Sequence, residues 1–207
     1  MRQILHALML MLILQMVAGT SARAQSFEVM PGTKRLFIDA QWLKAFDDGY
    51  RWTLFSRSRA TADYKDNTSL FSGAYVNYTF AGGFGLTLLG KIADSGGGGD
   101  AGVHYFNKSE EFMVYALASV GGGTQRSYNW FSIMRYTPAL ADEWKLFAGL
   151  ELFTAFVDAG HAGRVQRARL GLEHRSFQFG LALNLAEYGT DYTNVDVNPG
   201  LFVRREF

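Results

Sequence analysis

Apolar and polar side chains alternate along most of this chain. In the segment 177–186, every second residue is apolar, and the residues between them are polar or small. The apolar positions are Phe177, Phe179, Leu181, Leu183 and Leu185. The same alternation recurs in the segments 36–42, 84–92 and 144–152. A period of two predicts strands whose two faces meet different surroundings. Many such segments of about ten residues are the signature of a transmembrane β-barrel.

The alternation predicts an all-β, antiparallel, up-and-down barrel. We expect strands at 34–46, 51–64, 69–80, 84–94, 101–107, 111–120, 127–137, 143–157, 164–174, 177–188 and 196–207. Residues 26–30, followed by Pro31-Gly32-Thr33, supply a further strand and turn. Bacterial single-chain barrels generally have an even number of strands. The prediction is therefore twelve strands, with ten as the alternative if the first segment is free or if a weak pair of strands is miscounted.

The predicted connections alternate between two kinds. The shorter kind falls at 47–49, 81–83, 107–110, 138–142 and 173–176. The other kind is richer in Gly, Asn, Asp and Thr, and falls at 64–69, 95–100, 121–126, 158–163 and 189–194. Outer-membrane barrels have short periplasmic turns and longer outer loops. The first kind is therefore predicted to be periplasmic, and the run Gly96 to Gly99 is expected to be a flexible outer loop.

The first 24 residues have the three parts of a secretory signal peptide. Arg2 gives a positive start, an apolar stretch runs from Ala7 to Gly19, and Ala22-Arg23-Ala24 forms a cleavage site. The apolar stretch is shorter than the roughly 20 residues that a transmembrane helix needs. We therefore expect residues 1–24 to be removed and residues 25–207 to form the barrel as one domain.

Composition excludes several classes of function. Without Arg2 and Arg23, the 20 Lys and Arg residues become 18 against 19 Asp and Glu, a net charge of −1. That balance gives no reason to expect a nucleic-acid partner. Cysteine is absent, and the four His residues are scattered without ligand spacing. The sequence therefore predicts no disulfides, no metal site and no cofactor.

The last residues, from Gly200 to Phe207, alternate and end on an aromatic residue. This terminus resembles the C-terminal assembly signal of Gram-negative outer-membrane β-barrels. Leu201 and Val203 fit the apolar positions of that signal, whereas Arg205 departs from it. The resemblance implies a bacterial outer-membrane location, contact with outer-membrane lipid and lipopolysaccharide, and assembly by the outer-membrane insertion machinery through the strand that ends at Phe207. The sequence leaves the oligomeric state open.

Alternation assigns a set of charged side chains to the lumen. The predicted lumen bases, which are candidates for contact with anions, are Arg57, Arg59, Lys91, Arg135, Lys145, Arg167, Arg169 and Arg204. The predicted lumen acids are Asp39, Glu151, Glu173 and Glu206. Arginine binds carboxylate and phosphate through rigid paired hydrogen bonds. This set predicts a narrow channel or binding site for small anionic solutes. The alternative is a closed structural or interaction barrel, in which the same charges form ion pairs that fill the interior.

A catalytic hypothesis concerns His174, Ser176 and Glu187. His, Ser and Glu can act as base, nucleophile and orienting group. The three residues resemble the His-x-Ser pair and downstream Glu of outer-membrane lipid A deacylases. In the predicted topology, however, eleven residues of strand separate Ser176 from Glu187, a distance of more than about 30 Å. The expectation is therefore that the chain is not an enzyme, with a lipid A-modifying hydrolase as the third hypothesis.

Overall fold

The computed structural model describes residues 24–65, 67–80, 82–94, 96–122, 126–190, 192 and 194–207, and these form one closed antiparallel barrel of twelve strands with one extra short strand. The first six strands are β1 (Ala24–Pro31), β2 (Arg35–Ala45), β3 (Trp52–Asp63), β4 (Thr68–Thr79), β5 (Phe84–Ala93) and β6 (Gly96–Lys108). The others are β7 (Phe112–Gly122), β8 (Ser127–Tyr136), β10 (Trp144–Val157), β11 (Gly160–His174), β12 (Phe177–Tyr188) and β13 (Asn194–Glu206), and the short strand is β9 (Ala139–Ala141).

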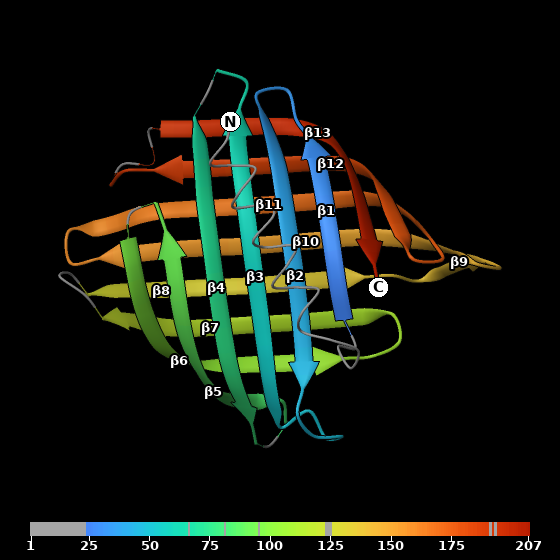
Figure 1. Cartoon of the computed structure of the whole chain (residues 1–207), viewed down its shortest axis with the longest axis horizontal. Coiled ribbons are helices and arrows are strands. Elements are labelled where there is room, and N and C mark those ends of the chain that lie inside the picture. The colour runs from blue at the N-terminus through green and yellow to red at the C-terminus, as the bar shows by residue number, and fades with distance from the viewer. Residues whose placement is uncertain are drawn as a thin grey trace.

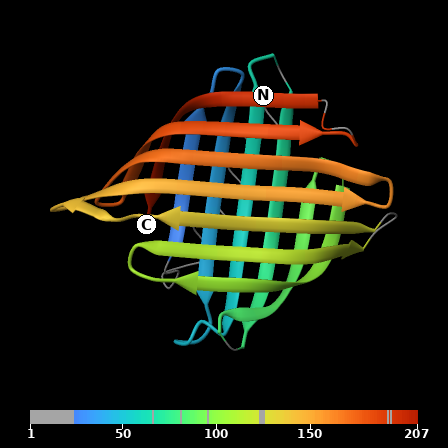
Figure 2. The ribbon, with the colours of Figure 1, turned by 180° about the vertical axis from the view of Figure 1, so that it is seen from behind.

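Each barrel strand pairs with its neighbours in the sequence, and β1 closes the barrel against β13. Two views show the barrel as two facing layers (Figures 1 and 2). Strands β1 to β4 lie in one layer and cross steeply over β7, β8 and β10 to β12 in the other. Side chains on opposite walls therefore face each other across a narrow interior.

β13 bends from one layer towards the other before it pairs with β1 (Figure 1). Pro199 and Gly200 lie in the middle of β13, and Gly200 makes an isolated bridge to Gly32 just beyond the end of β1. A Cβ atom at position 200 would lie 2.3 Å from the carbonyl oxygen of Pro31. Glycine in a strand interior often marks such a bend or a close approach of two backbones. The closure of the barrel therefore depends on the absence of a side chain at Gly200.

Gly200→Ala tests this dependence. The added methyl group collides with backbone rather than with a movable side chain, so we expect a smaller yield of refolded barrel and a lower melting temperature. The matched control is Gly90→Ala on β5, where an added Cβ would meet nothing within 4 Å. The heat-shifted gel band of the folded barrel measures both variants. Equal yields and melting temperatures would contradict the role given to Gly200.

The structure confirms the predicted fold class and the prediction of twelve strands. Residues 26–30 belong to β1, and Phe207 donates its backbone N–H to the carbonyl of Gln25 at 2.9 Å, so β1 begins at the end of the barrel where the chain terminates. We call this end periplasmic and the opposite end outer, following the predicted orientation. Residues 1–23, most of the predicted signal peptide, lie outside the described residues.

Two of the predicted outer loops are wrong in extent. Gly96 to Gly99 are the start of β6, and they pair with Gly90 to Ala93 of β5. The predicted loop 158–163 is reduced to a turn, because β11 already begins at Gly160. The glycine run has no side chains that could alternate, so the sequence pattern could not reveal its strand.

The outward face is an apolar band with aromatic rings near both ends. The most exposed apolar side chains of the band include Leu86, Leu88, Ile92, Leu170, Leu181 and Leu201. Exposed aromatic residues near the periplasmic end include Trp52, Phe80, Phe84, Phe112, Tyr136, Trp144 and Phe177, and those near the outer end include Tyr64, Tyr128, Trp130, Phe156 and Tyr188. Outer-membrane barrels show such a band between two aromatic girdles. None of the described residues forms a helix long and apolar enough to span a membrane.

Candidate functional site

The structure places all twelve predicted lumen charges on the inward faces of their strands. Each lies an even number of residues from a buried inward side chain of the same strand, as Arg135 does from Phe131 and Glu206 from Phe202. They do not form a single cluster. Six of the twelve gather in a central network, five lie at the periplasmic end, and Lys91 lies apart towards the outer end.

Arg57 connects the two layers of the barrel. Its guanidinium donates to Asp39 of β2 through Nε at 2.7 Å and through Nη2 at 3.0 Å. Its Nη1 lies 2.5 Å from Oε2 of Glu151, which belongs to β10 in the opposite layer. The side chains of Arg57 and Asp39 are each 3% exposed. A buried charge is tolerated when it is paired and hydrogen bonded, as it is here.

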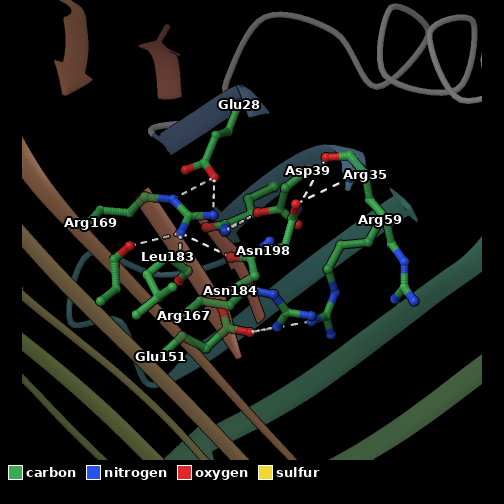
Figure 3. A network of polar contacts seen from close by, with 12 residues as sticks. Glu28, Arg35, Asp39, Arg59, Glu151, Arg167, Arg169, Leu183, Asn184 and Asn198 are labelled. Carbon is green, nitrogen blue, oxygen red and sulfur yellow. Dashed lines mark hydrogen bonds and ion pairs between the residues drawn. The ribbon is translucent and has the colours of Figure 1, made fainter. Parts of the chain in front are cut away.

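Glu151 receives three guanidinium groups. Besides Arg57, it contacts Arg59 Nη1 at 3.2 Å and Arg167 Nη1. Arg167 lies directly opposite Glu151 in the pairing of β10 with β11, whereas Arg59 reaches it from β3 across the barrel. Figure 3 shows Arg59 and Arg167 converging on the carboxylate.

A further pair lies beside these residues. Arg169 donates to Oε1 of Glu28 through Nε at 2.9 Å and through Nη2 at 2.8 Å, and its Nη1 donates to Oδ1 of Asn184 at 3.0 Å. Both charged side chains are buried. Glu28 was absent from the predicted lumen set because its segment is too short to show a firm alternation.

We call Arg57, Arg59, Arg167, Arg169, Glu28, Asp39 and Glu151 the central network. It contains four guanidinium groups and three carboxylates, so it carries one surplus positive charge. The Nε atoms of Arg59 and Arg167 are also buried without a hydrogen-bond partner among the described residues. Buried unpaired donors are costly and call for an explanation, such as a water or an ion. The central network therefore has both charge and hydrogen-bond donors to spare for an anion.

The remaining predicted bases have carboxylate neighbours. Lys91 lies 2.8 Å from Asp100, which also accepts from Asn129 at 3.0 Å. Asp100 was predicted to end an outer loop, and its role emerged only when the glycine run proved to be part of β6. At the periplasmic end, Lys145 of β10 lies opposite Glu173 of β11 at 3.6 Å.

Arg135, Arg204 and Glu206 form the periplasmic group. Arg135 donates to Gln41 at 2.9 Å, and Arg204 donates to Ser26 at 2.8 Å. Glu206 lies 3.6 Å from Arg135 and 3.4 Å from Arg204, and its side chain is 45% exposed. Two cations therefore share one exposed carboxylate at distances longer than a good charge-assisted hydrogen bond.

Three cavities lie along the lumen. A cavity of about 130 Å³ occupies the periplasmic half, where residues including Gln25, Tyr50 and Glu206 line it. A central cavity of about 40 Å³ is lined by the residues of the central network other than Arg59. A third cavity of about 70 Å³ lies towards the outer end, beside Asp196 and Asn198. The charged side chains of the centre thus separate two wider spaces by a constriction.

The structure does not assemble His174, Ser176 and Glu187 into a triad. His174 ends β11 at the periplasmic turn, where it stacks on Trp144 and lies 3.5 Å from Glu143. Glu187 lies ten residues beyond Phe177, near the outer end of β12, and contacts Arg164 at 3.6 Å. Ten strand residues correspond to about 30 Å. No group of three or more His, Asp or Glu residues among the described residues could hold a metal ion.

No family model and no curated protein matches this chain. Among solved structures, the fold is similar to that of KdgM porin, with a TM-score of 0.53 and 10% identity over 89% of this chain and 99% of that one. It is also similar to KdgM porin in complex with disordered oligogalacturonate, with a TM-score of 0.52, 10% identity and the same coverage of both chains. A third similar structure is LpxR from Salmonella typhimurium, with a TM-score of 0.50 and 9% identity over 89% of this chain and all of that one.

These likenesses show the fold of the chain. The closed barrel, the apolar band and the aromatic girdles agree with them and with the C-terminal signal. The chain is an integral outer-membrane β-barrel with a charged lumen.

Proposed function

We propose that this barrel is a narrow outer-membrane channel for small anionic solutes. The observation that carries the proposal is the convergence of Arg57, Arg59 and Arg167 on the single carboxylate of Glu151, between two wider cavities. A network that only stabilised the fold would be expected to balance its charges. Here one cation is in surplus, so an anion at the constriction is favoured and a cation is repelled.

The similarity to a porin supports the proposal at the level of fold. One of the similar structures is a KdgM porin in complex with disordered oligogalacturonate, and in the present chain a basic lumen would suit acidic solutes. The competing account is a closed barrel without transport. It is supported by the burial of Arg57 and Asp39, which leaves little free cross-section at the centre.

Solute uptake into liposomes distinguishes the two accounts. Purified barrel in lipid vesicles that also contain a potassium ionophore is exposed to potassium acetate, to glycerol and to tetramethylammonium chloride, and swelling is recorded. The ionophore lets potassium follow acetate, so that net uptake is electroneutral. The channel account predicts swelling in the order acetate, glycerol, tetramethylammonium. A closed barrel predicts no swelling above that of empty vesicles, which would overturn the proposal.

Two variants, Arg59→Gln and Arg167→Gln, test whether these arginines give the channel its preference for anions. Each leaves Glu151 paired with Arg57, so the fold keeps its central ion pair. We expect each variant to lower the preference for acetate over glycerol by about threefold to tenfold, because one charge-assisted contact at the constriction is lost. The matched control is Arg51→Gln, in the exposed periplasmic turn before β3, which should swell like the unmodified barrel. An unchanged acetate preference in both lumen variants would remove the central network from the permeation path.

A further inference from the structure

The cavity in the periplasmic half of the lumen differs from the central network in its chemistry. It is the largest of the three cavities described above, at about 130 Å³. Phe55, Met113, Tyr115 and Ile133 line its apolar part. Tyr50, which also lines it, is exposed in the periplasmic turn before β3, so the cavity is open to that side.

Several polar side chains also line the cavity beside these apolar residues, and they hydrogen bond to one another. Asn77 donates to Thr53 at 3.2 Å and accepts from Thr87 at 2.7 Å and from Tyr115 at 3.2 Å. The two ring nitrogens of His104 lie 2.8 Å from the Thr87 hydroxyl and 3.0 Å from the Thr79 hydroxyl. Tyr115 also stacks on the His104 ring. This wall therefore offers ring faces and a thioether to a ligand, with few free donors or acceptors.

Another part of the cavity lining is cationic, and it adjoins the apolar part, since Arg135 lies opposite Met113 in the pairing of β7 with β8. Arg135 and Arg204 both line it, and their shared carboxylate, Glu206, makes no contact with either at less than 3.4 Å. The side chain of Arg204 is only 6% exposed, and its Nε has no hydrogen-bond partner among the described residues. A buried guanidinium with an unused donor, beside an exposed and loosely held carboxylate, suits exchange of that carboxylate for one brought by a ligand.

We infer that this cavity binds a small monocarboxylate with an aromatic or similarly compact apolar body. The carboxylate contacts Arg204 and Arg135 in place of Glu206, and the body packs against Phe55, Met113 and Tyr115. An apolar protein cavity of about 150 Å³ is large enough to hold benzene. The inference deepens the proposed function, since it names a class of anion that would enter the channel. It rests on that function only for the claim that the ligand crosses the barrel.

Titration calorimetry of the refolded barrel in detergent micelles tests the inference without any transport. The probes are benzoate, acetate and benzyl alcohol. We expect saturable binding of benzoate, with acetate and benzyl alcohol each at least about tenfold weaker, because each lacks one of the two contacts. Equal binding of benzoate and acetate would reduce the cavity to a general anion site. Equal binding of benzoate and benzyl alcohol would leave an apolar cavity without a carboxylate contact. Either result, or no benzoate binding by folded barrel, overturns the inference.

Two variants, expected to change the affinity for benzoate in opposite directions, test whether Arg204 and Glu206 form the binding site. Arg204→Gln should weaken benzoate binding by about tenfold or more, since it removes a charge-assisted contact. Glu206→Gln should strengthen it by several fold, because the competing carboxylate is lost while the exposed position tolerates the change. If Arg204→Gln does not fold, Glu206→Gln still tests the inference. Unchanged or weaker binding of benzoate to the Glu206→Gln variant would contradict the replacement of the Glu206 carboxylate by that of the ligand. Arg51→Gln serves as the control with unchanged affinity.

Failure of this inference is distinguishable from failure of the proposed function. Benzoate binding without anion uptake into liposomes would keep the site and overturn the channel. Anion uptake without benzoate binding would keep the channel and overturn the site.

Discussion

Replacing Glu151 with Gln is expected to destabilise the folded barrel by about 3–5 kcal/mol, the cost of breaking a buried ion pair by removing one partner. Glu151 is the carboxylate on which Arg57, Arg59 and Arg167 converge, and its side chain is 9% exposed. The substitution keeps the shape of the side chain but leaves three guanidinium groups facing one another across the lumen. Their mutual repulsion, together with the lost pairing, gives the large expected effect.

Urea unfolding of the barrel in lipid vesicles, followed by tryptophan fluorescence, measures this change. The matched control is Glu110→Gln, exposed in the turn between β6 and β7, which should lie within about 0.5 kcal/mol of the unmodified protein. A Glu151→Gln effect as small as that of the control would mean that solvent, rather than Glu151, compensates the arginines.

The arginines around Glu151 should also be energetically coupled to it. Adding Arg167→Gln to the Glu151→Gln variant removes one of the unpaired cations, so we expect the double variant to be more stable than Glu151→Gln alone. The residues share one buried network, and such residues commonly show coupling of about 0.5–3 kcal/mol. Strictly additive effects would contradict the contact between these two side chains.

The second large effect concerns the outward face. Leu181 lies near the middle of β12 and is 64% exposed, on the side that we assign to lipid. Leu181→Arg is expected to lower stability in a bilayer by about 2–4 kcal/mol, because a cation would lie near the membrane midplane. Leu140→Arg is the control, since Leu140 is similarly exposed on β9, beyond the periplasmic end of β8. Comparable stabilities of the two variants in vesicles would contradict the placement of β12 across the membrane.

The barrel could be predicted from the sequence because its strands separate two different solvents. Lipid selects apolar residues such as Leu181, and the lumen selects residues such as Gln178, so the chain itself records which way each side chain faces. The strand count depended on residues 26–30, whose pattern is short. Their place became clear only through the pairing of Phe27 with Arg205 and of Val29 with Val203 in the closed barrel.

The sequence predicts which charged side chains face the lumen, but it does not predict which of them form ion pairs with one another. Alternation indicates that Arg57 and Glu151 face inward, yet they are far apart in the sequence and belong to opposite layers. Their meeting depends on how the strands tilt when the barrel closes, which no local pattern contains. Asp100 shows a second limit, because the glycines before it gave no alternation and concealed the strand that turns it towards Lys91.

The central network determines both the width and the charge of the lumen at its narrowest point. The pairing of Arg57 with Asp39 and Glu151 narrows the lumen. The surplus cation, together with the Nε donors of Arg59 and Arg167 that have no partner within the described part of the chain, favours an anion at that point. A narrow path with a fixed positive charge would conduct slowly and select strongly by charge.

The most direct test of this account is the reversal potential of single channels formed by the refolded protein in a planar bilayer, under a gradient of potassium chloride. The account predicts discrete conductance steps whose reversal potential lies towards the chloride equilibrium potential. Folded protein that gives no conductance steps, or steps that reverse towards the potassium equilibrium potential, would contradict it.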